Sequence, residues 1–197
     1  LLHAEATGTG QSVDVSAQES LSMSQEIAMQ TWDFQKKNVF RTGEMGSLPI
    51  VIPGNSTMKT LDGYVRLYVL APAGGDLPDL VEWMNDEGKA ADLLEEPYAS
   101  VVPLINMGWL TQLTSNPAEA ARVFPLLPHI NDVLRDFFLA ITSRYAYEEG
   151  QRRRLLVGIV STPKDLAENS QLRERGWYVP LAEAPAGKPV EFPGPPY

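Results

Sequence analysis

The chain has 197 residues, 44% hydrophobic and 21% charged, so it can bury a globular core and is not expected to be disordered. Its formal net charge of −9 argues against a nucleic-acid-binding protein, because an acidic surface repels phosphate. It lacks cysteine, which excludes disulfides and thiol chemistry, and its two histidines, His3 and His129, are far apart. No apolar run approaches the roughly 20 residues of a membrane span. We therefore expect no metal site, no nucleic-acid or membrane partner, and a cytoplasmic location.

The first residues are typical of the end of a helix. Residues 1–6 have no initiator Met, no signal peptide and no helix N-cap, so we expect a helix whose beginning is missing, with a processed terminus as the alternative. Gly8 and Gly10 break this helix, and residues 11–15 alternate as a strand does. Because these glycines follow a helix and precede a strand, they indicate a helix C-cap rather than a phosphate-binding loop.

Ser16 followed by Glu19 forms a capping box, which predicts a helix that extends to about Lys36. The next stretch, residues 37–57, is long and rich in Gly and Pro. We interpret it as a linker between domains, with the alternative that Gly43 and Gly46 belong to a loop that moves over a site.

A β-hairpin is expected after this linker, with strands at residues 58–60 and 64–69 and a tight Asp62-Gly63 turn. Residues 98–113 are apolar but interrupted and receive no assignment. The helical spacing of apolar residues, together with Pro and Asn caps, predicts four helices, at residues 77–87, 89–95, 116–124 and 130–151.

Three arginines, Arg152 to Arg154, close the last of these helices. Cations are favourable at a helix C-terminus, so we interpret them as structural, and the alternative is a phosphate contact to a ligand that bears a nucleotide.

The run that follows, residues 155–160, is apolar throughout and is typical of a strand buried on both faces in a parallel sheet. Thr162, Pro163 and Asp165 then form a helix start, and Gly176 can end the next short helix. Residues 177–179 and 190–192 are expected to pair as two strands. Strand, capped helix and strand together predict an α/β fold with a sheet larger than this segment supplies.

The residues themselves reveal no active site. No nucleophile stands beside a base, no pair of carboxylates occupies an apolar setting, and no group of residues has the spacing of metal ligands. The acidic pairs at residues 86–87 and 95–96 are interpreted as solvated helix faces.

Four blocks of sequence nevertheless resemble family III CoA-transferases, the group of formyl-CoA transferase, carnitine CoA-transferase and α-methylacyl-CoA racemase. They appear in family order and span nearly the whole chain. The blocks are TGTGQSVDVS at residues 7–16 with Glu19 after it, DGYV at residues 62–65, STPKDLAENSQLRERGWYV at residues 161–179, and PGPP at residues 193–196.

The resemblance implies a fold made of a doubly wound large domain and a smaller α+β domain, in an interlocked dimer. Residues 1–56 would end the first large-domain segment and carry the long helix and linker. Residues 57–151 would form the small domain, and residues 152–197 would return to the large domain. Gly43 and Gly46 would be the counterpart of the family's glycine-rich active-site loop.

The resemblance also implies the chemistry. In the family an aspartate attacks an acyl-CoA, and anhydride and enzyme-CoA thioester intermediates let CoA pass to another carboxylate. That aspartate would lie before Leu1, so no catalytic residue is carried over, no cofactor-binding residue is named, and coenzyme A enters as a thioester substrate rather than a covalently bound cofactor.

Three hypotheses follow. The chain is the C-terminal part of a CoA-transferase that is inactive alone, or of an acyl-CoA racemase with the same fold, or it is a non-catalytic subunit that pairs with an N-terminal-half chain. The partner is expected to be a second copy or that N-terminal-half chain, while the acyl group and the acceptor stay open.

Overall fold

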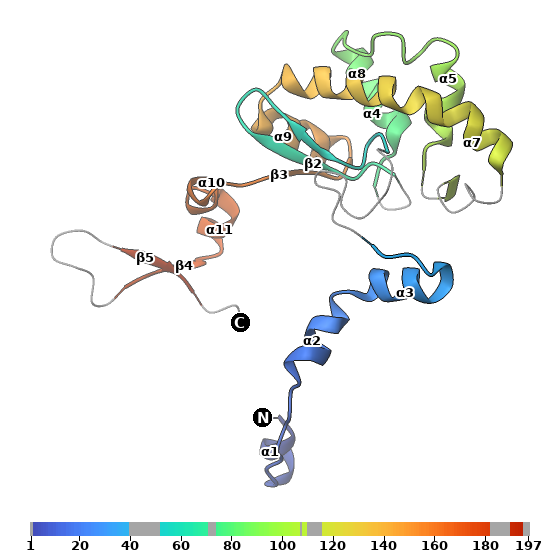
Figure 1. Cartoon of the computed structure of the whole chain (residues 1–197). Coiled ribbons are helices and arrows are strands. Elements are labelled where there is room, and N and C mark those ends of the chain that lie inside the picture. The colour runs from blue at the N-terminus through green and yellow to red at the C-terminus, as the bar shows by residue number, and fades with distance from the viewer. Residues whose placement is uncertain are drawn as a thin grey trace. The chain divides into compact units, whose positions relative to one another are not determined.

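A computed structural model describes residues 2–39, 52–70, 74–106, 108–109, 116–181 and 190–194 (Figure 1). The chain divides into two compact units, residues 1–47 and residues 48–197, which are described separately.

The described part of the first unit contains α1 (Leu2–Thr7), α2 (Ala17–Met23) and α3 (Glu26–Gln35). Ser16 caps α2 by accepting a hydrogen bond from the Glu19 backbone N–H, which is the Ser16 half of the predicted capping box. The expectation of one continuous helix to Lys36 is wrong. The Ser24 hydroxyl donates to the Leu21 carbonyl at 2.7 Å and closes α2, so a new helix must start.

The expected strand at residues 11–15 is not formed in this part of the structure. Val13 and Val15 are instead 73% and 71% exposed. A strand needs a neighbouring strand to satisfy its backbone groups, and the described residues of the first unit supply none.

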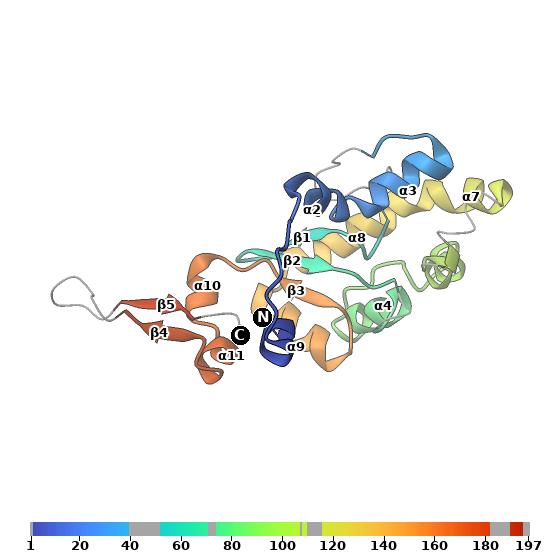
Figure 2. The ribbon, with the colours of Figure 1, turned by 90° about the horizontal axis from the view of Figure 1, so that it is seen from below.

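The second unit is built on a three-stranded antiparallel sheet in the order β1 (Thr57–Lys59), β2 (Tyr64–Leu67), β3 (Val157–Ile159). The three strands lie side by side in Figure 2. The β1–β2 hairpin is confirmed. The prediction that residues 155–160 form a strand of a parallel sheet, buried on both faces, is wrong. β3 runs antiparallel to β2, and Leu156 and Val160 are 41% and 48% exposed.

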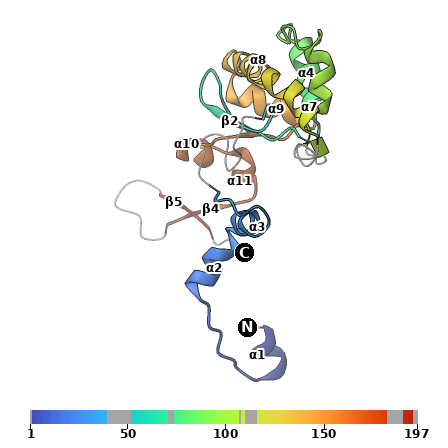
Figure 3. The same cartoon turned by 45° about the vertical axis from the view of Figure 1, so that its right-hand side comes forward.

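Helices cover one side of this sheet, as Figure 3 shows for α4, α8 and α9. Trp83 of α4 is fully buried at the centre of the core, with the rings of Phe137 and Phe138 edge-on to it at 5.0 and 6.1 Å. The helices are α4 (Leu77–Asp86), α5 (Tyr98–Val101), η2 (Val102–Leu104), α7 (Pro117–Val123), η3 (Phe124–Leu126), α8 (Leu127–Leu139) and α9 (Ser143–Arg152).

The helices expected at residues 77–87 and 116–124 form as α4 and α7. Asp76 caps α4 with a reciprocal capping box, and Asn116 caps α7 through the Glu119 N–H. The single helix expected at residues 130–151 is wrong, because the chain breaks after α8 and Thr142 caps a new helix, α9. The helix expected at residues 89–95 is also wrong, since this stretch forms turns.

The last segment contains α10 (Pro163–Ala167), α11 (Ser170–Glu174), β4 (Tyr178–Pro180) and β5 (Glu191–Pro193). The capping box of Thr162 and Asp165 is confirmed, as is the antiparallel β4–β5 pair. Gly176 follows α11 with a φ of 62°, a conformation that favours glycine. Since β3 pairs with β2, residues 157–159 share a sheet with residues 57–67, and the domain boundaries inferred from the family resemblance stay a prediction.

Candidate functional site

Gly43 and Gly46, the residues of the possible active-site loop, lie outside the described residues. Description resumes at residue 52, and residues 52–56 are firmly anchored in the second unit. Ile52 is 2% exposed, and the Val69 N–H donates to the Gly54 carbonyl at 2.8 Å. Gly54 has a φ of 80°, and a Cβ at this position would lie 2.4 Å from Val69 Cγ2. Position 54 therefore suits only glycine.

Residues 55 and 56 are also held to strand β2 by side-chain and backbone hydrogen bonds. Arg66 of β2 donates from Nη2 to Asn55 Oδ1 at 2.5 Å, and the Leu67 N–H donates to the Ser56 carbonyl at 2.9 Å. Ser56 itself is buried, at 5% exposed. Residues 52–56 are thus held firmly against the sheet just before β1.

The Asp62-Gly63 turn joins the hairpin to α9. The Ser143 N–H, at the first position of α9, donates to Asp62 Oδ1 at 2.7 Å, and the Thr60 and Ser143 hydroxyls share a 2.7 Å hydrogen bond. The backbone N–H of Ser143 is the main cause that lowers the pKa of Asp62. A Cβ at Gly63 would lie 2.9 Å from the Ser143 hydroxyl. The resemblance pointed to this turn, but its partner 81 residues away carries no sequence signal.

The arginines at the end of α9 are engaged within the unit. Arg153 pairs with Glu149 at 2.7 Å and with Asp86 at 2.8 Å, and Arg152 donates from Nε to Glu149 at 2.7 Å. Hydrogen bonds from Arg152 and then Arg153 lower the pKa of Glu149 to about 2. Arg153 also lies 6.0 Å from the centre of the Trp83 ring. These contacts favour the structural interpretation of Arg152 and Arg153 over a phosphate contact.

His129 also has a protein partner. Its Nε2 lies 2.8 Å from Asp92 Oδ1, and the Tyr98 ring stacks on the imidazole at 4.6 Å. The hydrogen bond to His129 is the main cause that lowers the pKa of Asp92. Among the described residues, no group of three or more His, Cys, Asp or Glu could hold a metal ion.

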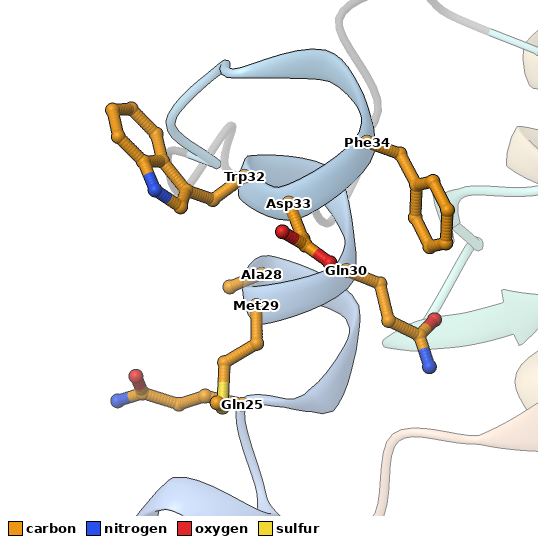
Figure 4. A pocket seen from close by; sticks show the side chains of 7 residues that line it. All are labelled: Gln25, Ala28, Met29, Gln30, Trp32, Asp33 and Phe34. Atoms are coloured by element: carbon orange, nitrogen blue, oxygen red, sulfur yellow. The ribbon is translucent and has the colours of Figure 1, made fainter.

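Two of the surface hollows are lined entirely by described residues. One follows α3, and Figure 4 shows Trp32 and Phe34 leaving opposite sides of this helix, so the hollow is open rather than enclosed. The other, of about 190 Å³, lies between α4 and the segment around η2. It is lined by Pro78, Val81, Glu82, Asn85, Leu93, Leu94, Ala99, Val102 and Pro103. Neither hollow brings together a nucleophile and a base.

Comparison with known proteins tests the family membership that the motifs suggested. The sequence pattern of CoA-transferase family III matches residues 1–197. The chain belongs to CoA-transferase family III. This family III chain is also 29% identical over 200 residues to the succinyl-CoA:(R)-benzylsuccinate CoA-transferase subunit BbsE of Thauera aromatica. That alignment covers 100% of this chain and 43% of BbsE, so the chain spans less than half the length of this relative.

Solved structures show the same fold. A CAIB/BAIF family protein from Brucella suis is 17% identical and matches with a TM-score of 0.55 over 90% of this family III chain and 40% of its own. Rv3272 from M. tuberculosis is 13% identical and matches with a TM-score of 0.55 over 100% of this chain and 43% of its own. At these identities the likeness concerns the fold alone. In the described part of the chain, no helix is long and apolar enough to cross a membrane.

Proposed function

We propose that this chain is the C-terminal portion of a CoA-transferase that moves CoA between an acyl-CoA and a carboxylic acid. The observation that carries the proposal is the family III match over residues 1–197, together with an alignment that spans 43% of the CoA-transferase subunit BbsE. A role of Gly43 and Gly46 in a loop over the reacting groups stays a prediction of the family resemblance.

The nucleophile of the proposed reaction is an aspartate outside this chain. Its attack on the thioester carbonyl would form an acyl anhydride and expel CoA as a thiolate, which then attacks the aspartyl carbonyl, releases the donor acid and leaves CoA on the aspartate as a thioester. The acceptor carboxylate would attack this thioester to form a second anhydride, and the released thiolate would attack the acceptor acyl group to give the new acyl-CoA and the free aspartate. Coenzyme A is thus a substrate that enters as a thioester. The substrates of BbsE are not carried over, and the proposal stays at the level of an acyl-CoA donor and a carboxylate acceptor.

A companion chain is part of the proposal. The relative is named a subunit, which is compatible with a partner chain, either a second copy in an interlocked dimer or an N-terminal-half chain that supplies the remaining part of the enzyme. The exposed Val13 and Val15, with no strand beside them in the described part of the first unit, need such a neighbour. A location in the cytoplasm stays a prediction.

The test compares this chain alone with the chain joined to, or mixed with, the polypeptide encoded upstream of it. Transfer of CoA from acyl-CoA donors to isotope-labelled carboxylic acids is expected only when both parts are present. CoA exchange by the purified chain alone would overturn the placement of the nucleophile. The same assay in D₂O distinguishes a racemase from a transferase, because a racemase incorporates deuterium at the α-carbon of the acyl-CoA without any acceptor acid.

A further inference from the structure

The hollow of about 190 Å³ beside α4 is built on one face of that helix. Four residues of α4 line it: Pro78, Val81, Glu82 and Asn85. Their spacing of three and four residues places them on a common face, and the fully buried Trp83 lies on the other side of the helix. We call this feature the α4 hollow.

The deepest part of the α4 hollow is apolar. Val81, Leu93 and Val102 line it and are at most 4% exposed. Leu94 also lines the hollow but is 54% exposed, so it belongs to the rim. Seven of the nine lining residues are apolar, and an apolar group is therefore the occupant that loses least on leaving water.

The size of the α4 hollow limits what can fill it. A volume of about 190 Å³ corresponds to about six water molecules at the roughly 30 Å³ that each occupies in the liquid. This is room for one aliphatic side chain, and it is smaller than the roughly 300–1,000 Å³ of sites for drug-sized ligands. The size thus favours one side chain of a protein partner over a free organic molecule.

The rim of the α4 hollow carries carboxylates that the chain leaves unpaired. Asp86, one residue beyond the lining, pairs with Arg153 at 2.8 Å. By contrast, the carboxylates of Glu82, Glu95 and Glu96 have no ion-pair partner within the described part of the chain. Glu82 lines the hollow itself, and Glu95 and Glu96 directly follow Leu94 of the rim.

Most of the negative charge of the chain is gathered around this hollow. Residues 76–103, which supply all of its lining, contain eight Asp and Glu but only one Lys. They hold a net charge of −7 out of −9 for the whole chain. A complementary partner is positively charged, because charges of opposite sign speed the encounter of two surfaces and fix how they dock.

We propose that the α4 hollow is a docking site for a basic segment of a partner protein, which inserts one aliphatic side chain between Val81, Leu93 and Val102. Lysine or arginine residues on either side of the inserted side chain would pair with Glu82 and with Glu95 and Glu96. An apolar anchor in a small hollow, with charged groups at the rim, is the usual arrangement of a protein-binding hot spot. The site does not depend on the transfer reaction proposed above.

The test uses the 197-residue chain and short synthetic peptides, followed by the fluorescence anisotropy of a dye on the peptide. The probe Lys-Lys-Leu-Lys-Lys should bind with a dissociation constant of about 0.1 mM in 50 mM NaCl, as expected for a single anchor. Lys-Lys-Ser-Lys-Lys keeps the charge but lacks the anchor and should bind at least about tenfold more weakly. Glu-Glu-Leu-Glu-Glu keeps the anchor and should not bind.

Three results with these probes would overturn the proposal. Equal affinity of the leucine and serine peptides would show attraction by charge alone, and no binding of the leucine peptide at chain concentrations up to about 1 mM would show that no site exists. Displacement of the peptide by an equal concentration of hexylammonium would identify a site for small amines instead of a protein segment.

A matched pair of variants tests the position of the anchor. Ala99 lines the hollow from α5 and is partly exposed, so Ala99→Leu places its added atoms in the hollow without weakening the helix. It should weaken binding of the leucine peptide at least about tenfold. Ala121→Leu makes the same change at an exposed position of α7 and should leave binding unchanged. An Ala99→Leu variant that binds like the unmodified chain would refute the assigned hollow.

A charge variant keeps the test decisive if Ala99→Leu fails to fold, which circular dichroism would reveal. Glu82→Gln leaves the hollow open and removes one rim carboxylate, so it should bind the leucine peptide about threefold more weakly. Its affinity should also fall less steeply than that of the unmodified chain as NaCl rises from 50 to 500 mM. Glu174→Gln, at an exposed position of α11, is the control and should change neither quantity. Unchanged affinity and salt dependence in Glu82→Gln would count against the assigned rim contact.

Discussion

A single added methyl group at Gly54 should be costly. Its φ of 80° lies in the left-handed region, which costs an alanine about 1–2 kcal/mol. The added Cβ would also lie 2.4 Å from Cγ2 of Val69, a fully buried side chain that cannot move into solvent. Overpacking of this kind costs about 1–3 kcal/mol. Gly54→Ala should therefore reduce the free energy of unfolding by about 2–5 kcal/mol, a large share of the stability of a typical domain.

The assay is urea unfolding at 25 °C, followed by the fluorescence of the buried Trp83 and the other tryptophans. Gly88→Ala is the matched control, because Gly88 has a φ of 67° but no atom within 4 Å of an added Cβ. Gly88→Ala should reduce the free energy of unfolding only by the cost of placing an alanine in the left-handed region, about 1–2 kcal/mol. Equal reductions in the free energy of unfolding for the two variants would show that the Val69 side chain moves aside at no cost, and this would refute the reasoning. Adding Val69→Ala to Gly54→Ala should recover part of the loss, as a double-mutant cycle would measure.

Two further predictions concern carboxylates with lowered pKa values. Glu149→Gln should destabilise the protein by about 2 kcal/mol at pH 7 but little near pH 2. The reason is that the folded pKa of about 2 lies below the unfolded value, so the stabilisation is present above about pH 4.5 and is lost as the pH falls toward 2. Urea midpoints at both pH values measure this, and a loss independent of pH would contradict it. Asp62→Ala should cost about 1–3 kcal/mol, because it removes the acceptor of the Ser143 N–H. Asp62→Asn keeps an acceptor oxygen and should cost less, so equal unfolding free energies for the two variants would exclude this explanation.

Features that depend on a few consecutive residues were predictable from the sequence. The caps at Ser16, Asn116 and Thr162 are local hydrogen bonds between a side chain and a backbone N–H two or three positions later, and they form as predicted. The β1–β2 hairpin follows from Asp62-Gly63 in the same way.

Features that depend on distant partners were not predictable. An apolar run such as residues 155–160 suits a strand, but its composition does not reveal that β2 will be its antiparallel neighbour. The helical spacing of apolar residues across residues 130–151 concealed the break between α8 and α9. No Gly or Pro marks this break, and Thr142 caps the second helix. The Asp62–Ser143 contact spans 81 residues, so sequence reasoning identified the turn but not what it holds.

The order of the strands has a mechanical consequence. β1 and β3 both run antiparallel to β2, so they run parallel to each other on its two sides. The chain enters the sheet at Thr57, in the row of Arg66 and Gly158, and leaves beyond Ile159, at the opposite end of β2. Tension between the entering and leaving segments would therefore pull β1 and β3 in opposite directions along their axes. Such a load shears all the hydrogen bonds on both sides of β2 together, instead of opening them one at a time as peeling would.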